Sequence, residues 1–198
     1  MKILAFSDLH CDHRRAANLV TLSAEADLVL GAGDFASCHR GLKSTIAALA
    51  AIETPTVIVP GNNETESALR AAAAGWEAAT VLQASSVTLD GVEIFGLGAG
   101  IPTTPWDWSF DIEEPEAARL LAACPNQALL VLHSPPFGHV DCSTAGAHLG
   151  SKAILEAIER TAPRLAVCGH IHESWHTKSM IGETPVYNLG PDGTWLEL

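Results

Sequence analysis

Apolar runs alternate with segments of helical periodicity through the first half of the chain. Three short apolar runs, each stopped by polar residues or by a turn, indicate buried strands: residues 2–6, 28–30 and 56–59. Three segments with apolar positions at helical spacing follow them: residues 14–24, 42–52 and 65–74. Thr65, at the start of the last segment, is a suitable helix N-cap. This order predicts parallel strands joined by helical crossovers.

The second half combines both kinds of segment with longer loops. Residues 86–89 and 92–97 flank Asp90-Gly91, a dipeptide that favours a β-hairpin, and residues 98–112 form a loop rich in Gly, Pro and Trp. Two further helices are expected at residues 113–123 and 151–161, and two further strands at residues 128–132 and 165–167. The last three segments suggest an antiparallel meander: residues 175–180, 186–189 and 194–198. The whole pattern predicts an α/β fold with two mixed sheets packed face to face and helices outside, in one domain over residues 1–198.

Composition excludes several classes of protein. Hydrophobic residues make up 47% of the chain and charged residues 17%, which is typical of a globular enzyme. The formal net charge is −12 and there is no Lys/Arg run, so we expect no nucleic-acid polymer as a partner. No apolar stretch reaches the roughly 18 residues that a membrane span needs, so no membrane partner is expected. The five cysteines show no metal-finger spacing and suggest reduced thiols in a cytoplasmic protein.

Six short phrases pair a turn or a strand end with side chains that can bind metals. They are Asp8-Leu-His10, Gly33-Asp34, Gly61-Asn62-Asn63-Glu64, His133-Ser-Pro-Pro, His148-Leu-Gly150-Ser151 and Gly169-His170-Ile-His172. Five of them follow an apolar, strand-like run. Because ligands of an open α/β sheet gather at the carboxyl ends of strands, we expect these side chains to converge. If the chain stays extended between Asp8 and His10, both side chains point the same way. Carboxylates, imidazoles and a carboxamide meeting in this way favour a site for two divalent cations.

This ordered set of motifs resembles the calcineurin-like metallophosphoesterase family, from residue 3 to about residue 190. The resemblance implies a four-layer α-β-β-α sandwich. It also implies one metal held by Asp8, His10, Asp34 and His172, and a second held by Asp34, Asn62, His133 and His170, with Asp34 bridging the two. Mixed nitrogen and oxygen ligands suit Mn, Fe, Zn, Co or Ni, so the identity of the metals stays open.

The residue types fit phosphoester hydrolysis. A water shared by two cations becomes acidic enough to act as a nucleophile near neutral pH and to attack phosphorus in line with the leaving oxygen. Neutral imidazoles keep the site positive, so that a phosphate anion can bind. The predicted function is therefore hydrolysis of a small phosphodiester or phosphomonoester, with that ester as the partner. The sequence carries no signal for the oligomeric state.

The chain departs from the family pattern at Asn63, where the family has a histidine thought to protonate the leaving group. An amide cannot act as a general acid near pH 7, so we expect diesters or activated leaving groups to be preferred. The candidate catalytic residues are Asp34, Asn63 and His148. The candidate substrate contacts are Asn63, His139, His148 and Trp106. Trp106 lies in an aromatic segment with Trp108 and Phe110 that forms either a substrate wall or a loop held by buried aromatic rings.

A narrower resemblance links this chain to the small branch of the family related to class III cyclic-nucleotide phosphodiesterases. It rests on the segments Gly96–Pro102, Trp106–Phe110, His133–Pro136 and Gly146–Ser151, together with Asp141. It implies hydrolysis of small phosphate esters and does not identify one. The role of Glu64 also stays open between support of the ligands and a favourable charge at a helix N-terminus.

Two other functions compete with this interpretation. The first is a non-catalytic scaffold of the same fold, although scaffolds of this kind typically lose the ligand histidines that this chain keeps. The second is a metallo-β-lactamase-type hydrolase, suggested by Asp8-Leu-His10-Cys-Asp12-His13. That fold normally places several strands before its motif, and only seven residues precede Asp8.

Overall fold

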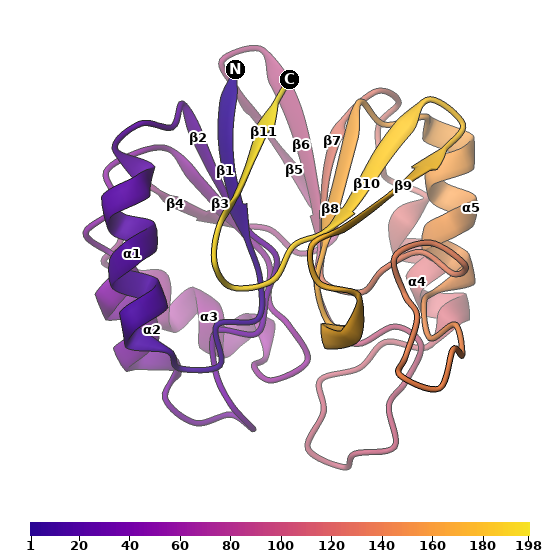
Figure 1. The fold of residues 1–198 in the computed structure, drawn as a ribbon, viewed down its shortest axis with the longest axis horizontal. Coiled ribbons are helices and arrows are strands. Elements are labelled where there is room, and N and C mark those ends of the chain that lie inside the picture. Colours follow the sequence, from indigo (N-terminus) through magenta and orange to yellow (C-terminus); the bar gives the residue numbers. More distant parts are fainter.

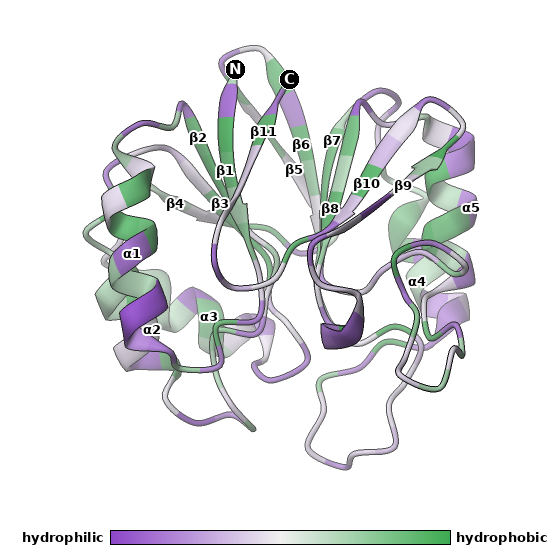
Figure 2. Cartoon of the chain, viewed as in Figure 1, coloured by the Kyte–Doolittle hydropathy of each residue, from purple (hydrophilic) through white to green (hydrophobic).

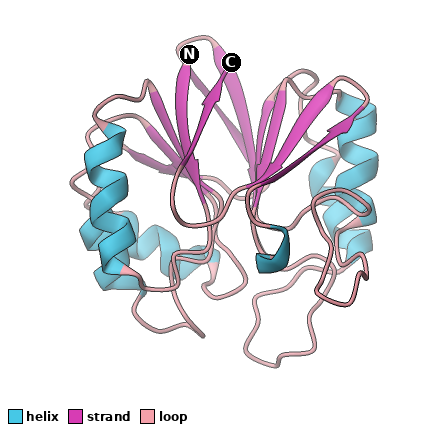
Figure 3. Ribbon diagram, viewed as in Figure 1, coloured by secondary structure: helices cyan, strands magenta, loops and turns pink.

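The computed structural model describes residues 1–198 and shows two β-sheets packed between two layers of helices (Figures 1 and 3). The first sheet has the order β11-β1-β2-β3-β4. Its strands are β1 (Lys2–Phe6), β2 (Leu28–Gly31), β3 (Thr56–Ile58), β4 (Ala79–Val81) and β11 (Thr194–Glu197). β1 to β4 run parallel, and β11 pairs antiparallel with β1.

The second sheet has the order β5-β6-β7-β8-β10-β9 and is also mixed. Its strands are β5 (Ser85–Leu89), β6 (Val92–Leu97), β7 (Leu129–Leu132), β8 (Leu165–Cys168), β9 (Thr177–Ile181) and β10 (Thr184–Asn188). β5 and β6 form the predicted hairpin, whereas β6, β7, β8 and β10 are parallel. β9 closes the edge antiparallel to β10.

Helices cover the outer face of each sheet (Figure 1). The first sheet is covered by α1 (His13–Ser23), α2 (Leu42–Leu49) and α3 (Glu66–Ala73). The second sheet is covered by α4 (Glu114–Leu121) and α5 (Lys152–Thr161), and a single 3-10 turn, η1 (His172–Ser174), follows β8. Thr65 caps α3 as predicted, because its side chain accepts a hydrogen bond from Ala68 N. None of these helices has the length and apolar content needed to cross a membrane.

Three separate apolar cores explain the four layers. In β1, Leu4 and Phe6 belong to the core beneath α1, α2 and α3, whereas Ile3 and Ala5 belong to the core between the two sheets. A third core joins the second sheet to α4 and α5. Because both faces of the central strands are buried, they are apolar at nearly every position, and Figure 2 shows them as mostly hydrophobic. The predicted four-layer α-β-β-α fold with two mixed sheets is confirmed.

Three details differ from the sequence expectations. The three-residue edge strand β4 was not predicted, since a half-buried segment this short carries no clear periodicity. The helix expected over residues 42–52 ends at Leu49, although Ile52 remains buried in the same core. The predicted C-terminal meander is only partly correct: β9 and β10 pair antiparallel as expected, but β10 also pairs in parallel with β8, and β11 crosses to the other sheet.

The crossing to β11 brings the last loop against the end of β1. Ser7 N donates a hydrogen bond to Gly190 O at 2.9 Å, and Gly190 N donates to Ser7 Oγ at 3.0 Å. The loops that follow β1, β2, β3, β7 and β8 all gather at this end of the molecule, and the two termini lie at the opposite end (Figure 1). The polar phrases of the sequence are therefore brought together by the strands that precede them.

Candidate metal centre

Two groups of ligand-capable side chains share Asp34. Within each group, one nitrogen or carboxylate oxygen per residue lies within 4.8 Å of the others. The first group consists of Asp8, His10, Asp34 and His172. The second consists of Asp34, His133 and His170, and Asn62 Oδ1 joins it at 3.2 Å from His133 Nε2 and 3.1 Å from His170 Nδ1. All seven residues predicted as ligands therefore meet in one place.

The backbone reaches this arrangement through turns and not through extended chain. Asp8, His10, Asp34 and His170 have φ values of 54°, 42°, 59° and 69°. Such left-handed conformations are unfavourable for residues other than Gly and cluster at functional sites. The expectation of an extended chain between Asp8 and His10 is therefore wrong, yet both side chains reach the same group because the chain turns at each of them.

Two glycines allow the β2 and β3 loops to touch at the centre of the site. Gly33 has a φ of +89°, and a Cβ there would lie 2.6 Å from His133 Nδ1. A Cβ at Gly61 would overlap the carboxylate of Asp34. These positions require glycine because backbone and ligand side chains occupy the space that any side chain would take.

Backbone carbonyls orient two of the histidines toward the centre. His133 Nδ1 donates to Ala32 O at 2.8 Å, and His10 Nδ1 donates to Ala36 O at 3.1 Å. Each bond fixes the tautomer, so that the unprotonated Nε2 of each ring faces the other ligands. His10 Nε2 lies 3.2 Å from the Nε2 of His172 and 3.4 Å from Asp34 Oδ2.

The amide of Asn62 is also held in one orientation. Asn62 Nδ2 donates to Ser109 Oγ at 2.9 Å, and Ser109 Oγ donates to Asp111 Oδ1 at 2.7 Å. The carbonyl oxygen of Asn62 must then face His133 and His170, which is the orientation that a ligand needs. Ser109 and Asp111 were not predicted as supports of a ligand, because they lie in the irregular 98–112 loop about fifty residues from Asn62.

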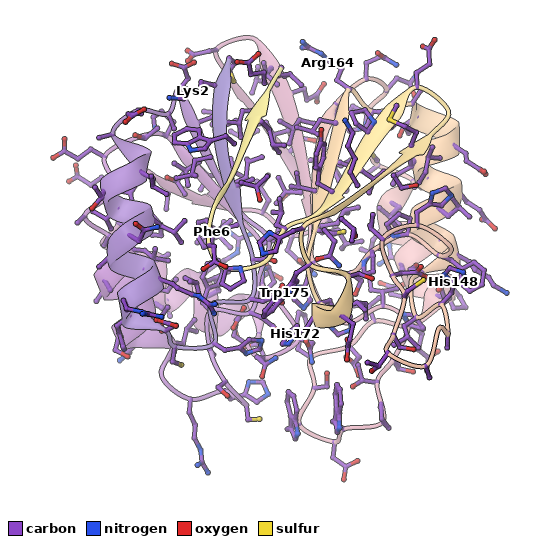
Figure 4. All side chains as sticks on the ribbon, in the orientation of Figure 1. Lys2, Phe6, His148, Arg164, His172 and Trp175 are labelled. Carbon is purple, nitrogen blue, oxygen red and sulfur yellow. The ribbon has the colours of Figure 1, made fainter.

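The carboxylate of Asp8 accepts hydrogen bonds from residues that follow strands of both sheets. Its Oδ2 accepts hydrogen bonds from Ser7 Oγ and, at 2.9 Å, from Trp175 Nε1, and its Oδ1 accepts from His170 N at 3.1 Å. Trp175 follows η1 and lies beside His172 near the middle of the molecule, where the loops of the two sheets meet (Figure 4). Its ring contacts the His172 ring at a centroid distance of 4.4 Å. Trp175 is therefore a positioning residue that the sequence motifs did not reveal.

We expect Trp175→Phe to weaken metal binding and metal-dependent turnover about 10- to 100-fold, because loss of a hydrogen bond that orients a ligand has this typical effect. The ring is kept, so the change tests the N–H group. Titration with Mn²⁺ measures the affinity. Trp195→Phe is the matched control, since Trp195 lies on β11 beneath the Lys2 ammonium, 4.2 Å from its ring centroid. Equal Mn²⁺ affinities in the two variants would contradict the role of Trp175.

The electrostatics of the site fit bound cations. Asp8 and Asp34 are 1% and 2% exposed, and the groups that face their carboxylates as ion-pair partners are histidines. Burial, together with the nearby Asp8 carboxylate, raises the pKa of Asp34 to about 7. Buried carboxylates without cationic partners are costly, and coordination of a metal removes that cost.

The two histidines of the second group, His133 and His170, are in the protonation state that metal binding needs. Burial and the neighbouring His133 lower the pKa of His170 to about 3, and burial also lowers the pKa of His133. Both rings are therefore neutral near pH 7, which is the form that binds metals. The donor set, with its buried carboxylates and neutral imidazoles, fits two divalent cations.

Glu64 supports the loops beneath the ligands. It is fully buried, and its carboxylate accepts hydrogen bonds from four backbone N–H groups, those of Gly61, Asp34, Phe35 and Ala36, at 2.7–3.3 Å. Burial and the Asp34 carboxylate raise the pKa of Glu64 to about 8, and the N–H groups oppose that rise. Glu64 therefore joins the β2 and β3 loops and does not act as an exposed charge at the start of α3.

Asn63 lies beside the shared carboxylate. Its backbone N donates to Asp34 Oδ1 at 2.9 Å, its Nδ2 donates to Asp34 Oδ2 at 2.7 Å, and its Oδ1 accepts from Cys38 N at 2.8 Å. Asn63 is 6% exposed and contributes to the wall of the cavity. It can donate a hydrogen bond there, but it carries no transferable proton.

A cavity of about 530 Å³ opens over the ligands. Its wall is formed by three sets of residues: the candidate ligands His10, Asp34, Asn62, His170 and His172, the 102–108 segment with Trp106 and Trp108, and the residues Ser37, Asn63, Ser143, Leu149, Ile171 and Glu173. Volumes of this size are typical of sites for small molecules. Trp106 thus lies where the sequence predicted a substrate contact.

The structure does not bring His139 or His148 to this cavity. His148 Nδ1 donates to Asp141 Oδ1 at 2.6 Å, and its ring packs near Phe137 on the side of the molecule where α4 and α5 lie (Figure 4). His139 Nδ1 lies 2.7 Å from Ser179 Oγ on β9. The hydrogen bonds in their own loop and with β9 hold both rings away from the ligand groups, so neither is placed to contact a phosphate there.

The fold and this site together define an α/β protein with a candidate metal centre at the strand ends. The family model for the calcineurin-like phosphoesterase superfamily domain matches residues 1–195, and the chain belongs to that superfamily. The resemblance drawn from the motifs is confirmed at the level of the family. The chain's clustered His and Asp side chains are the candidate metal ligands.

Curated relatives match at moderate identity. The UPF0046 protein T07D4.2 of Caenorhabditis elegans is 26% identical, over 86% of this chain and 52% of that protein. Metallophosphoesterase domain-containing protein 1 of Homo sapiens is 33% identical, over 48% of this chain and 29% of that protein. The chain thus spans about half of the first relative and less of the other.

Solved structures share the fold. The structure of TT1561 of Thermus thermophilus has a TM-score of 0.77 at 19% identity, covering 96% of this chain and 88% of that one. A dimetal phosphatase from Danio rerio has a TM-score of 0.62 at 13% identity, covering 96% and 87%. At these identities the similarity establishes the architecture.

Proposed function

We propose that this protein hydrolyses small phosphate esters with two divalent metal ions, and that it prefers diesters or activated leaving groups. The observation that carries the proposal is the pair of ligand groups that share Asp34 at the base of a 530 Å³ cavity. The structural neighbour from Danio rerio is described as a dimetal phosphatase, which supports the use of two metals.

Each residue of the site has a part in this proposal. Asp8, His10, Asp34 and His172 would hold one cation, and Asp34, Asn62, His133 and His170 the other. Bound divalent cations supply Lewis acidity, which lowers the pKa of a coordinated water and neutralises charge on phosphate oxygens. The chain itself contributes neutral imidazoles, a fixed Asn62 carbonyl and the Asn63 amide, which can donate a hydrogen bond to a phosphate oxygen.

The wall of the cavity supports the proposed preference for good leaving groups. Asp107 does not line the cavity, and apart from Glu173 every titratable side chain on its wall belongs to the two ligand groups. Asn63 cannot supply a proton, and His139 and His148 lie elsewhere. A leaving oxygen must therefore depart without a dedicated acid, which favours esters whose alcohols or phenols are already acidic.

Hydrolysis of bis(p-nitrophenyl) phosphate and p-nitrophenyl phosphate by protein loaded with Mn²⁺, Zn²⁺, Co²⁺, Ni²⁺ or Fe²⁺ tests the activity directly. We expect metal-dependent turnover that EDTA abolishes, with the diester preferred. Uptake of two metals without turnover of either ester would instead support a metal-binding scaffold.

Asn63→His should restore a group that can donate a proton beside the phosphate. We expect kcat/KM for substrates with poor leaving groups to rise up to about 100-fold, with a smaller change for p-nitrophenyl esters, because general acid catalysis matters most when the leaving group is basic. A series of aryl phosphodiesters with leaving phenols of different pKa measures the dependence on leaving group. The wild type should show the steeper dependence; equal slopes would contradict the assignment of Asn63.

A further inference from the structure

Trp106 is an exposed aromatic ring on the wall of the candidate active site. It is 51% exposed, although it is one of the largest apolar side chains in the protein. One face of its indole ring stacks on Trp108, with centroids 5.5 Å apart and planes 10° from parallel. That contact occupies one face of the Trp106 ring, and both rings line the cavity that contains His10 and Asp34.

The loop that carries Trp106 is fixed relative to the candidate ligands. Thr104 donates to Asp111 Oδ2 from its backbone N at 2.7 Å and from its Oγ1 at 2.8 Å. The other oxygen of Asp111 accepts from Ser109, which in turn accepts from the ligand Asn62. Asp111 therefore couples the position of Trp106 to the metal centre, and a rigid platform loses little entropy when a ligand binds.

Half of the exposed large apolar side chains of the protein line this cavity. Four large apolar side chains are exposed: Trp106, Leu149, Met180 and Trp195. Two of them, Trp106 and Leu149, line the cavity, together with the more buried Ile171. An apolar patch beside a polar cluster indicates a ligand with one ionic end and one apolar part.

We propose that the face of Trp106 opposite Trp108 binds a flat aromatic group of the phosphate ester by stacking. The proposal rests on the proposed function, since it assumes that the phosphate lies on the metal ligands below. An aromatic group satisfies the geometry better than an alkyl chain, because the quadrupoles of two offset rings attract one another in addition to the apolar contact. Trp106 is thus a specificity-determining residue, and the substrates are aryl or heteroaryl phosphate esters.

Simple phosphonates test this inference without ambiguity about which ester group leaves. Phenylphosphonate, cyclohexylphosphonate and methylphosphonate share the anionic group and differ only in the attached group. Their affinities for the Mn²⁺-loaded full chain are measured by calorimetry and as inhibition constants against bis(p-nitrophenyl) phosphate. We expect phenylphosphonate to bind about 3- to 10-fold more tightly than cyclohexylphosphonate, the range that an aromatic pair adds to apolar burial.

Substitutions at the ring complete the test. Trp106→Leu should abolish the preference for phenyl over cyclohexyl, Trp106→Phe should keep part of it, and methylphosphonate should bind all variants equally. Trp195→Leu, at an exposed Trp outside the cavity, should behave as the wild type. Equal binding of the phenyl and cyclohexyl compounds to the wild type, with turnover intact, would overturn the stacking site alone. Failure of all three phosphonates to bind would overturn both this inference and the proposed function.

Discussion

Asp34→Asn should reduce metal-dependent turnover at least about 10³-fold, a loss of about 4 kcal/mol of transition-state stabilisation. Asp34 is the residue common to both ligand groups, so one substitution removes a charge from both. The side-chain amide of Asn has almost the same shape as the Asp34 carboxylate. The loss of turnover therefore measures the contribution of the negative charge and of the two carboxylate oxygens that can bind metal. Steady-state kinetics and metal content, measured on the same preparations, give the result.

The metal-free variant separates this effect from a loss of folding. Burial and Asp8 raise the pKa of Asp34 to about 7, above its value in the unfolded chain, so the ionised carboxylate lowers stability at pH 8. We therefore expect metal-free Asp34→Asn to remain folded, because removal of the buried charge offsets the one hydrogen bond from Asn63 that the amide cannot accept. Asp90→Asn is the matched control, since Asp90 is exposed in the β5–β6 turn and Asn-Gly suits that turn equally well. Full activity in Asp34→Asn would contradict the shared-ligand role.

Glu64→Ala should lower the free energy of unfolding of the metal-free protein by at least about 3 kcal/mol, because four buried N–H groups lose their acceptor. Glu64→Gln keeps one acceptor oxygen and should fall between the alanine variant and the wild type. Chemical denaturation in EDTA measures the order without reference to activity.

Glu66→Ala provides the comparison two residues further on. Glu66 is exposed on the first turn of α3, where it pairs with Arg70, and such surface pairs contribute at most about 1 kcal/mol. Similar losses in Glu66→Ala and Glu64→Ala would mean that Glu64 acts only through the start of the helix. In that case the account of the β2 and β3 loops would be wrong.

Much of the fold could be predicted because the central strands are buried on both faces. Runs such as those at β1 and β7 are apolar at every position, or nearly so, and the polar or glycine residue that follows each run marks its end. Pairing between distant strands leaves no such local signal. The position of β11 in the first sheet depends on its pairing with β1 from the other end of the chain, and the short strand β4 depends on its pairing with β3.

The ligand set could also be predicted, whereas its supporting residues could not. The candidate ligands follow strand ends, so topology alone brings them together. Trp175 and Ser109 each form one hydrogen bond with a ligand that is distant in the sequence, and Asp111 acts by accepting a hydrogen bond from Ser109. His148 shows the converse error: its motif-like setting suggested chemistry, but its hydrogen bond to Asp141 keeps it in its own loop.

The most direct test of the central claim, that two cations share Asp34, is an anomalous difference map from crystals of the protein loaded with Mn²⁺. We predict two manganese peaks about 3.5–4 Å apart, as in other two-metal sites. One should lie among Asp8, His10 and His172, the other among Asn62, His133 and His170, with the Asp34 carboxylate between them. A map with a single peak, or with none beside Asp34, would contradict the account.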